Sequence, residues 1–196
     1  MFALFAAAFM IISFLPVEEN IPGGEIITSP YYAKMQYAGN LGLASVGIGK
    51  TYLKDRLSLD FNYGYLPKKI NGSRVHTLAL KSAYQFRKHQ LLAFDIRYYT
   101  GFSLNYAITD NTYLSYPDYF PSNYYNSNAF HLNPFLGIRL TLPEKKDKPG
   151  AIGIYVEMGT VDYKIWYALA NKEIKPDDIW NLCFGITIPL SNNLLR

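Results

Sequence analysis

Strict alternation of apolar residues with small or polar residues is the feature that most constrains this chain. It is clearest in residues 57–65 (LSLDFNYGY), where every odd position is large and apolar or aromatic and every even position is small or polar. Side chains of a β-strand point alternately to opposite faces, so this segment predicts a strand with one apolar and one polar face. A helix would instead need apolar residues every three or four positions.

The same alternation recurs along most of the chain beyond residue 25. It predicts seven strands, over residues 41–53, 57–65, 75–86, 91–106, 130–142, 151–162 and 179–190. Only residues 165–171 show helical spacing, so the fold class is predicted to be all-β. Most of these strands are longer than the roughly five or six residues usual in soluble sheets. They match or exceed the roughly 9 to 11 residues with which a tilted strand crosses a bilayer.

The connections between the predicted strands differ in length. In chain order they cover residues 54–56, 67–74, 87–90, 107–128, 143–150 and 163–178. Short turns on one side and longer loops on the other are typical of outer-membrane barrels. This order requires one more strand before residue 41, and residues 31–37 (YYAKMQY) alternate suitably. The chain is therefore predicted to form an eight-stranded antiparallel up-and-down transmembrane β-barrel.

The N-terminal segment is predicted to be a secretory signal. Residues 2–15 (FALFAAAFMIISFL) carry no charge and are followed by Pro16. As a helix they would span about 21 Å, which is shorter than the roughly 30 Å of hydrocarbon in a bilayer. We therefore assign residues 1–24 to a signal peptide and N-terminal segment, and residues 25–196 to the barrel domain. A buried apolar helix of a soluble protein is the alternative.

The small or polar positions of the predicted strands, which we call their polar phase, indicate a narrow lumen. It contains many glycines, which weaken strands on a soluble surface but fit inside a small barrel. Six charged residues share this phase: Asp60, Lys81, Asp95, Arg97, Arg139 and Glu157. Burying any one of them alone would be costly, so we expect them to pair in a network that fills the lumen and leaves no open pore. The alternative is that they are solvated surface charges.

Aromatic residues gather near the loop ends of the predicted strands. A girdle at the membrane interface is expected from Tyr63, Tyr65, Tyr98, Tyr99, Tyr106, Trp166 and Trp180. The longest loop carries six further rings that are candidates for stacking on a glycan or a partner: Tyr113, Tyr116, Tyr119, Phe120, Tyr124 and Tyr125. An extension of the girdle or a self-packed cap is the alternative for that loop.

Composition and motifs predict no cofactor, no metal and no nucleic acid. The net charge is +4, and the basic residues are scattered rather than gathered on one face. Cys183 is the only cysteine, so it forms neither an intrachain disulfide nor a zinc site with paired cysteines. The expected partners are membrane lipid and lipopolysaccharide, with an envelope protein or glycan as a candidate partner of the external loops.

One arrangement resembles a catalytic site. His131, Asn133 and Glu157 are similar to the His-x-Ser motif and glutamate of outer-membrane lipid A deacylases, but Asn133 stands where the nucleophilic serine is required. The chain is therefore predicted not to be an enzyme. A lipid-modifying enzyme and an exported soluble β-barrel that binds a small apolar ligand remain the alternatives.

Three stretches carry a resemblance to a known group of proteins. They are residues 31–50 (YYAKMQYAGNLGLASVGIGK), 57–68 (LSLDFNYGYLPK) and 75–78 (VHTL). They resemble uncharacterised outer-membrane β-barrel proteins of Bacteroidota. The resemblance implies the outer membrane of a Gram-negative cell and no established activity. The leading expectation is an integral outer-membrane barrel with a filled, non-conducting lumen, structural or interacting through its loops.

Overall fold

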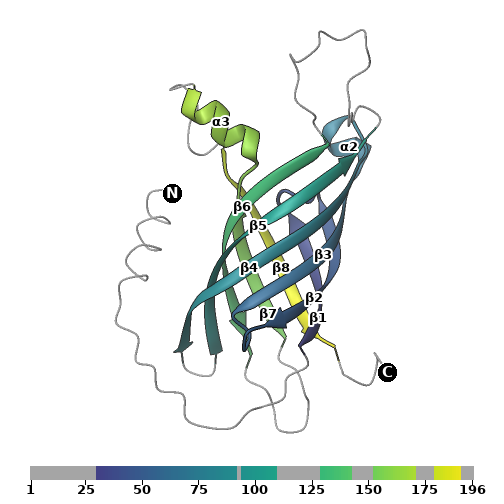
Figure 1. Cartoon of the computed structure of the whole chain (residues 1–196). Helices are drawn as coiled ribbons and strands as arrows, with labels where there is room; N and C mark the ends of the chain where they lie inside the picture. Colours follow the sequence, from purple (N-terminus) through teal and green to yellow (C-terminus); the bar gives the residue numbers. More distant parts are fainter. Residues whose placement is uncertain (1–29, 92–93, 110–128, 143–151, 171–178, 191–196) are drawn as a thin grey trace.

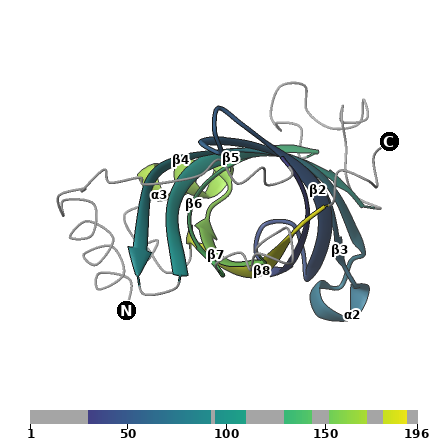
Figure 2. The same cartoon turned by 90° about the horizontal axis from the view of Figure 1, so that it is seen from below.

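The computed structural model shows a closed β-barrel of eight strands and describes residues 30–91, 94–109, 129–142, 152–170 and 179–190. The strands are β1 (Tyr31–Ala38), β2 (Ala44–Tyr52), β3 (Leu57–Leu66), β4 (Val75–Leu91), β5 (Phe94–Ile108), β6 (Phe130–Thr141), β7 (Gly153–Gly159) and β8 (Asn181–Pro189). Each strand pairs antiparallel with the next, and β1 closes the ring against β8 (Figures 1 and 2). The eight-stranded antiparallel up-and-down barrel expected from the sequence is confirmed. The signal peptide expected within residues 1–24 lies outside the described residues.

The alternation in the sequence sets the two faces of the barrel wall. Along β3, Asp60 and Asn62 are only 2% and 1% exposed, whereas their neighbours Phe61 and Tyr63 are exposed on the outside. The polar phase therefore points into the lumen and the apolar phase points outward. This arrangement reverses the one found in soluble proteins, which bury their apolar residues.

The hairpin between β4 and β5 is longer than the sequence pattern predicted. We expected a turn at residues 87–90, but pairing continues from Arg87 opposite Tyr98 to Leu91 opposite Phe94. A register shift follows Gln85, and a bulge of this kind disturbs the strict alternation on which the prediction depended. β4 and β5 consequently extend beyond neighbouring strands (Figure 1).

The connection between β1 and β2 folds into the mouth of the barrel. Leu41 is 3% exposed, and a Cβ added to Gly64 on β3 would lie 2.0 Å from the Leu41 carbonyl oxygen. The Asn40 amide donates to the Thr160 carbonyl at 3.2 Å, and Asn105 on β5 donates to the Asn40 carbonyl at 3.3 Å. The predicted strand over residues 41–53 therefore begins too early, because its first residues belong to this inward connection.

Two helices lie at the same end of the barrel, which we call the upper end (Figure 1). α2 (Lys68–Asn71) connects β3 to β4, and α3 (Asp162–Ala170) follows β7 and overlaps the segment predicted to be helical at 165–171. The opposite, lower end carries the tight turn between β2 and β3. No helix in the described part of the chain has the length and apolar character that a membrane span requires.

Candidate functional site

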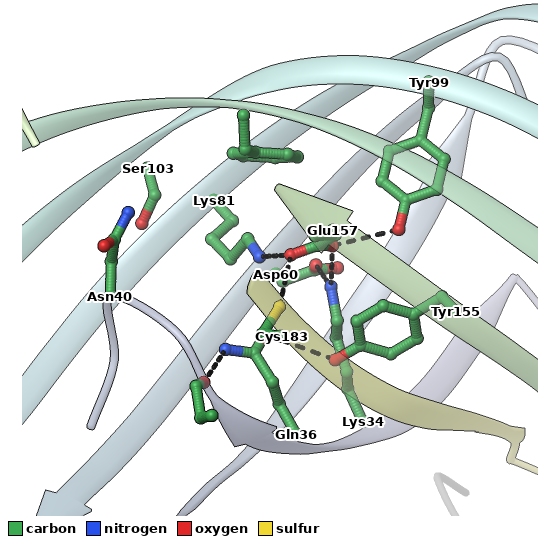
Figure 3. A network of polar contacts seen from close by, with 12 residues as sticks. Lys34, Gln36, Asn40, Asp60, Lys81, Tyr99, Ser103, Tyr155, Glu157 and Cys183 are labelled. Carbon is green, nitrogen blue, oxygen red and sulfur yellow. Dashed lines mark hydrogen bonds and ion pairs between the residues drawn. The ribbon is translucent and has the colours of Figure 1, made fainter. Parts of the chain in front are cut away.

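Four charged side chains from four strands meet inside the barrel (Figure 3). They are Lys34 from β1, Asp60 from β3, Lys81 from β4 and Glu157 from β7, and each is less than 5% exposed. We call these four residues the lumen cluster. Its two ammonium groups and two carboxylates balance in charge, which is the condition under which buried charges are tolerated.

Lys34 joins the two carboxylates of the lumen cluster. Its Nζ donates to Asp60 Oδ2 at 3.0 Å and to Glu157 Oε1 at 3.1 Å. Lys81 Nζ donates to the other oxygen of Glu157, Oε2. The four groups thus form one chain of ion pairs across the lumen. Removing charges from water is costly, so such a chain is maintained only when several short contacts offset that cost.

Hydroxyl and thiol groups complete the hydrogen bonding of the carboxylates. Tyr32 donates to Asp60 Oδ1, and Tyr99 donates to Glu157 Oε1 at 3.0 Å. The Cys183 thiol approaches Glu157 Oε2 at 3.6 Å. Glu157 therefore accepts from two ammonium groups, a phenol and a thiol. With its oxygens occupied in this way, Glu157 is poorly placed to orient a catalytic base.

Three inward tyrosines lie against glycines on the neighbouring strands. The cross-strand pairs are Tyr32 with Gly49, Tyr99 with Gly137 and Tyr155 with Gly185. A Cβ added to these glycines would lie 2.4, 2.4 and 2.3 Å from the ring Cζ atoms, far inside van der Waals contact. The missing side chains therefore leave the space that the three rings occupy. The Tyr155 ring in turn faces Lys34, whose Nζ lies 4.5 Å from the ring centroid.

The six charged residues expected to form one network lie at different heights in the barrel. Asp60, Lys81 and Glu157 belong to the lumen cluster. Arg139 packs next to it, with its guanidinium carbon 5.7 Å from the Tyr32 ring centroid and 5.4 Å from that of Tyr99. Within the described residues, Arg139 makes cation-π contacts and no ion pair.

The structure corrects the expectation for Asp95 and Arg97, which pair outside the lumen cluster. Asp95 Oδ2 lies 3.0 Å from Nζ of Lys88, whose side chain is half exposed. Arg97 Nη1 lies 3.8 Å from Asp55 Oδ2. Both residues occupy the lower end of β5, where the extended hairpin leaves the level of the cluster.

Lys34, which bridges the cluster, is absent from the set expected from the sequence. The signal that identifies it is the alternation in residues 31–37, where Lys34 shares its phase with Tyr32 and Gln36. All three side chains are buried in the lumen.

Ten of the expected aromatic residues fall into three groups; of the other three girdle candidates, Tyr106 and Trp180 are partly exposed and Trp166, on α3, is 76% exposed. Tyr63 and Tyr65 are exposed on the outer wall near the upper end. Tyr99 was assigned to the girdle, but it is 4% exposed and points into the lumen, and Tyr98 is also buried. The six loop rings lie outside the described residues: Tyr113, Tyr116, Tyr119, Phe120, Tyr124 and Tyr125.

His131 lies at the upper rim rather than beside Glu157. Its Nδ1 is 3.2 Å from Oδ1 of Asp162, the first residue of α3. The other oxygen of Asp162 accepts the backbone N–H of Leu132 at 3.1 Å, so this pair fastens α3 to β6. The deacylase-like set of His131, Asn133 and Glu157 is therefore not assembled, because Glu157 is engaged in the lumen cluster.

The described residues contain no group of three or more His, Cys, Asp or Glu side chains that could hold a metal ion.

Comparisons with known proteins do not assign the chain. No family model and no curated protein matches the chain. Its function must therefore be inferred from its own residues.

Proposed function

We propose that this chain is an integral outer-membrane β-barrel protein with a filled, non-conducting lumen, structural or interacting through its external loops. One observation carries the proposal: apolar side chains face outward around the whole ring, while buried ion pairs face inward. Membrane lipid and lipopolysaccharide are the partners that fit such a surface.

The outward apolar surface has contributions from every strand. One representative from each of β1 to β8 is Met35, Ile48, Phe61, Leu80, Phe102, Leu132, Ile154 and Phe184. These side chains are between 47% and 63% exposed. Monomeric soluble proteins rarely expose a continuous apolar surface of this extent, whereas the hydrocarbon of a bilayer would cover it.

Aromatic side chains flank this apolar surface at both ends. Exposed rings near the upper end belong to Tyr37, Tyr63, Tyr65 and Phe130. Exposed rings near the lower end belong to Tyr52, Tyr84, Phe86 and Phe94. Two aromatic girdles are typical of transmembrane barrels, because these rings are most stable where hydrocarbon meets headgroups.

The lumen supports a closed rather than a conducting barrel. The lumen cluster crosses it in the middle, and the inward connection with Leu41 covers part of the upper mouth. Eight strands leave an interior that side chains can fill. A soluble barrel that binds an apolar ligand would need an apolar interior, but here Lys34, Asp60 and Asn62 line it.

The connections support an orientation in the membrane. The tight β2–β3 turn is at the lower end, and α2 and α3 are at the upper end. In outer-membrane barrels the short turns face the periplasm and the long loops face the outside. We therefore propose that the upper end is external, which agrees with the resemblance to outer-membrane barrels of Bacteroidota.

The test of this proposal is extraction and gel mobility. The protein should need detergent for extraction from membranes, and it should change gel mobility when boiled in detergent, because a closed barrel stays folded until heated. Extraction by salt alone together with an unchanged mobility would refute membrane integration.

A pair of variants sharpens this test. Ile48→Arg places a charge on the outer wall, and it should impair insertion at a cost of up to about 2 to 4 kcal/mol. Ile70→Arg makes the same change at a similarly exposed isoleucine on α2, beyond the strands, and should insert normally. Equal behaviour of the two variants would contradict a lipid-facing wall.

A further inference from the structure

Positive charge collects below the lumen cluster, at the lower end of the barrel. Arg97 on β5 and Arg139 on β6 are cross-strand partners, and Arg56 lies in the turn before β3. These three arginines line a recess together with Ser58 and Asp55. We call it the arginine recess. Among the described residues that line it, Asp55 is the one carboxylate, so the lining carries an excess of two positive charges.

Two arginines of this recess have N–H groups without an acceptor among the described residues. Nε of Arg97 and Nε of Arg139 are both buried without a partner among the described residues. The contacts that Arg97 does make are long, 3.4 Å to Gln85 Oε1 and 3.8 Å to Asp55 Oδ2. A buried N–H without an acceptor is costly, so both groups favour an acceptor that enters the recess.

The lumen cluster does not supply that acceptor. Asp60 and Glu157 are already matched by Lys34 and Lys81, so Arg139 is a further cation, and no carboxylate among the described residues lies within ion-pair distance of it. An anion from outside the chain would meet this need without disturbing the cluster.

We propose that the arginine recess binds a phosphate group. A guanidinium presents parallel N–H donors from Nε and Nη that fit two oxygens of one phosphate, and two arginines from paired positions of neighbouring strands line this recess. The excess of two positive charges matches a phosphate monoester, which carries a charge of about −1.5 to −2 near pH 7. About 280 Å³ of space lies within and in front of the recess, part of it open solvent, so a phosphate would enter from this open side.

The phosphate can belong to a soluble molecule or to a lipid headgroup. The chemistry of recognition is the same in both cases, and the arginine recess does not depend on where the barrel resides. Under the orientation proposed above, it opens toward the periplasm.

The test is titration calorimetry of the full barrel in detergent micelles and phosphate-free buffer. The probes are inorganic phosphate and glycerol 3-phosphate, measured against chloride at equal ionic strength. We expect saturable binding of one phosphate per barrel. Arg97→Gln should raise the dissociation constant for phosphate at least tenfold. Arg74→Gln removes the same charge from an exposed residue at the upper end and should leave that constant unchanged.

A second variant tests whether the planar arrangement of the guanidinium N–H donors matters, apart from their positive charge. Arg139→Lys keeps the positive charge but lacks the planar fork, so it should also weaken phosphate binding while the heat-dependent gel mobility shows a folded barrel. If Arg139→Lys fails to fold, the comparison of Arg97→Gln with Arg74→Gln decides alone, because Arg97 retains 20% exposure of its side chain at the lower end.

Short-chain phosphatidic acid serves as the lipid probe. Binding of this lipid without binding of the soluble phosphates would support the proposal and would show that the bound phosphate belongs to a lipid headgroup. No saturable binding of any phosphate would overturn it. So would equal losses in Arg97→Gln and Arg74→Gln, or binding of succinate as tight as that of glycerol 3-phosphate.

Discussion

Lys34 on β1 and Glu157 on β7 are joined by a 3.1 Å ion pair inside the barrel, although 123 positions separate them in the sequence. Their strands do not pair with each other, because β8 lies between them. The ion pair therefore ties together the region where the first strand closes the ring against the last. Its removal should affect the closed barrel more than the loss of an ordinary surface contact.

Removing the charge of Glu157 should strongly destabilise the barrel. Glu157→Gln leaves Lys34 and Lys81 buried with one carboxylate between them, which should lower the free energy of unfolding by about 3 to 5 kcal/mol. The control Asp95→Asn breaks a partly exposed pair with Lys88 and should cost less than about 1 kcal/mol. Urea unfolding in lipid vesicles measures both. Similar losses would show that burial does not distinguish the two carboxylates.

The Lys34–Glu157 contact should appear as a coupling energy. Lys34→Met combined with Glu157→Gln should lose less stability than the sum of the single variants, by about 0.5 to 3 kcal/mol, because each single change already breaks the shared ion pair. Lys34→Met combined with Asp95→Asn should be additive. A double-mutant cycle with no coupling between Lys34 and Glu157 would refute a shared network.

Filling the space beside Tyr99 should strain the barrel wall. Gly137→Ala would place a Cβ 2.4 Å from the Tyr99 ring, and overpacking of this kind should cost about 1 to 3 kcal/mol of unfolding free energy. Gly159→Ala, whose Cβ would meet its nearest atoms at 3.2 Å, should cost less. The cost of Gly137→Ala should be smaller when it is measured in a Tyr99→Leu background, because the clashing ring is then absent. Equal losses for the two alanine variants would show that ring contact is not the cause.

The folded barrel should not conduct ions. We expect the chain of ion pairs across the lumen and the inward Leu41 to block the water path that permeation requires. Planar bilayer recordings should show a flat baseline for protein whose folding has been verified by gel mobility. Steady single-channel currents from such protein would contradict a filled lumen.

The barrel should not remove acyl chains from lipid A. Hydrolysis requires a nucleophile beside a base, and His131 contacts Asp162 while Asn133 offers no hydroxyl. Mass spectrometry of lipid A incubated with the purified protein should show unchanged acyl chains. Loss of an acyl chain that disappears in His131→Ala would establish the enzymatic alternative.

The fold was largely predictable from the sequence because alternation reports directly on which face a residue occupies. Alternation predicted seven strands, and the order of short and long connections required an eighth over residues 31–37, which the structure shows as Tyr31–Ala38. The missed boundaries have local causes: a register shift after Gln85 hides the end of β4, and the segment containing Leu41 alternates like a strand but folds into the mouth.

The candidate site was less predictable because alternation gives the face but not the height of a residue along the barrel. Arg97 and Lys81 share the inward phase, yet one lies at the lower end and the other in the lumen cluster. Height depends on how far each strand is offset from its neighbours. The alternation could have placed Lys34 on the inward face, since Lys34 has the same phase as Tyr32.

The tyrosine–glycine pairs also help to fix the register in which neighbouring strands pair. A one-residue slip would turn every side chain to the wrong face, so two residues is the smallest slip that keeps the apolar phase outside. Sliding β5 by two residues would move Tyr99 from Gly137 to Phe135 or Arg139, where a side chain already fills the space. The total slide around a closed ring is its shear number, which together with eight strands determines the barrel radius. Three glycines thereby help to set how wide the lumen is.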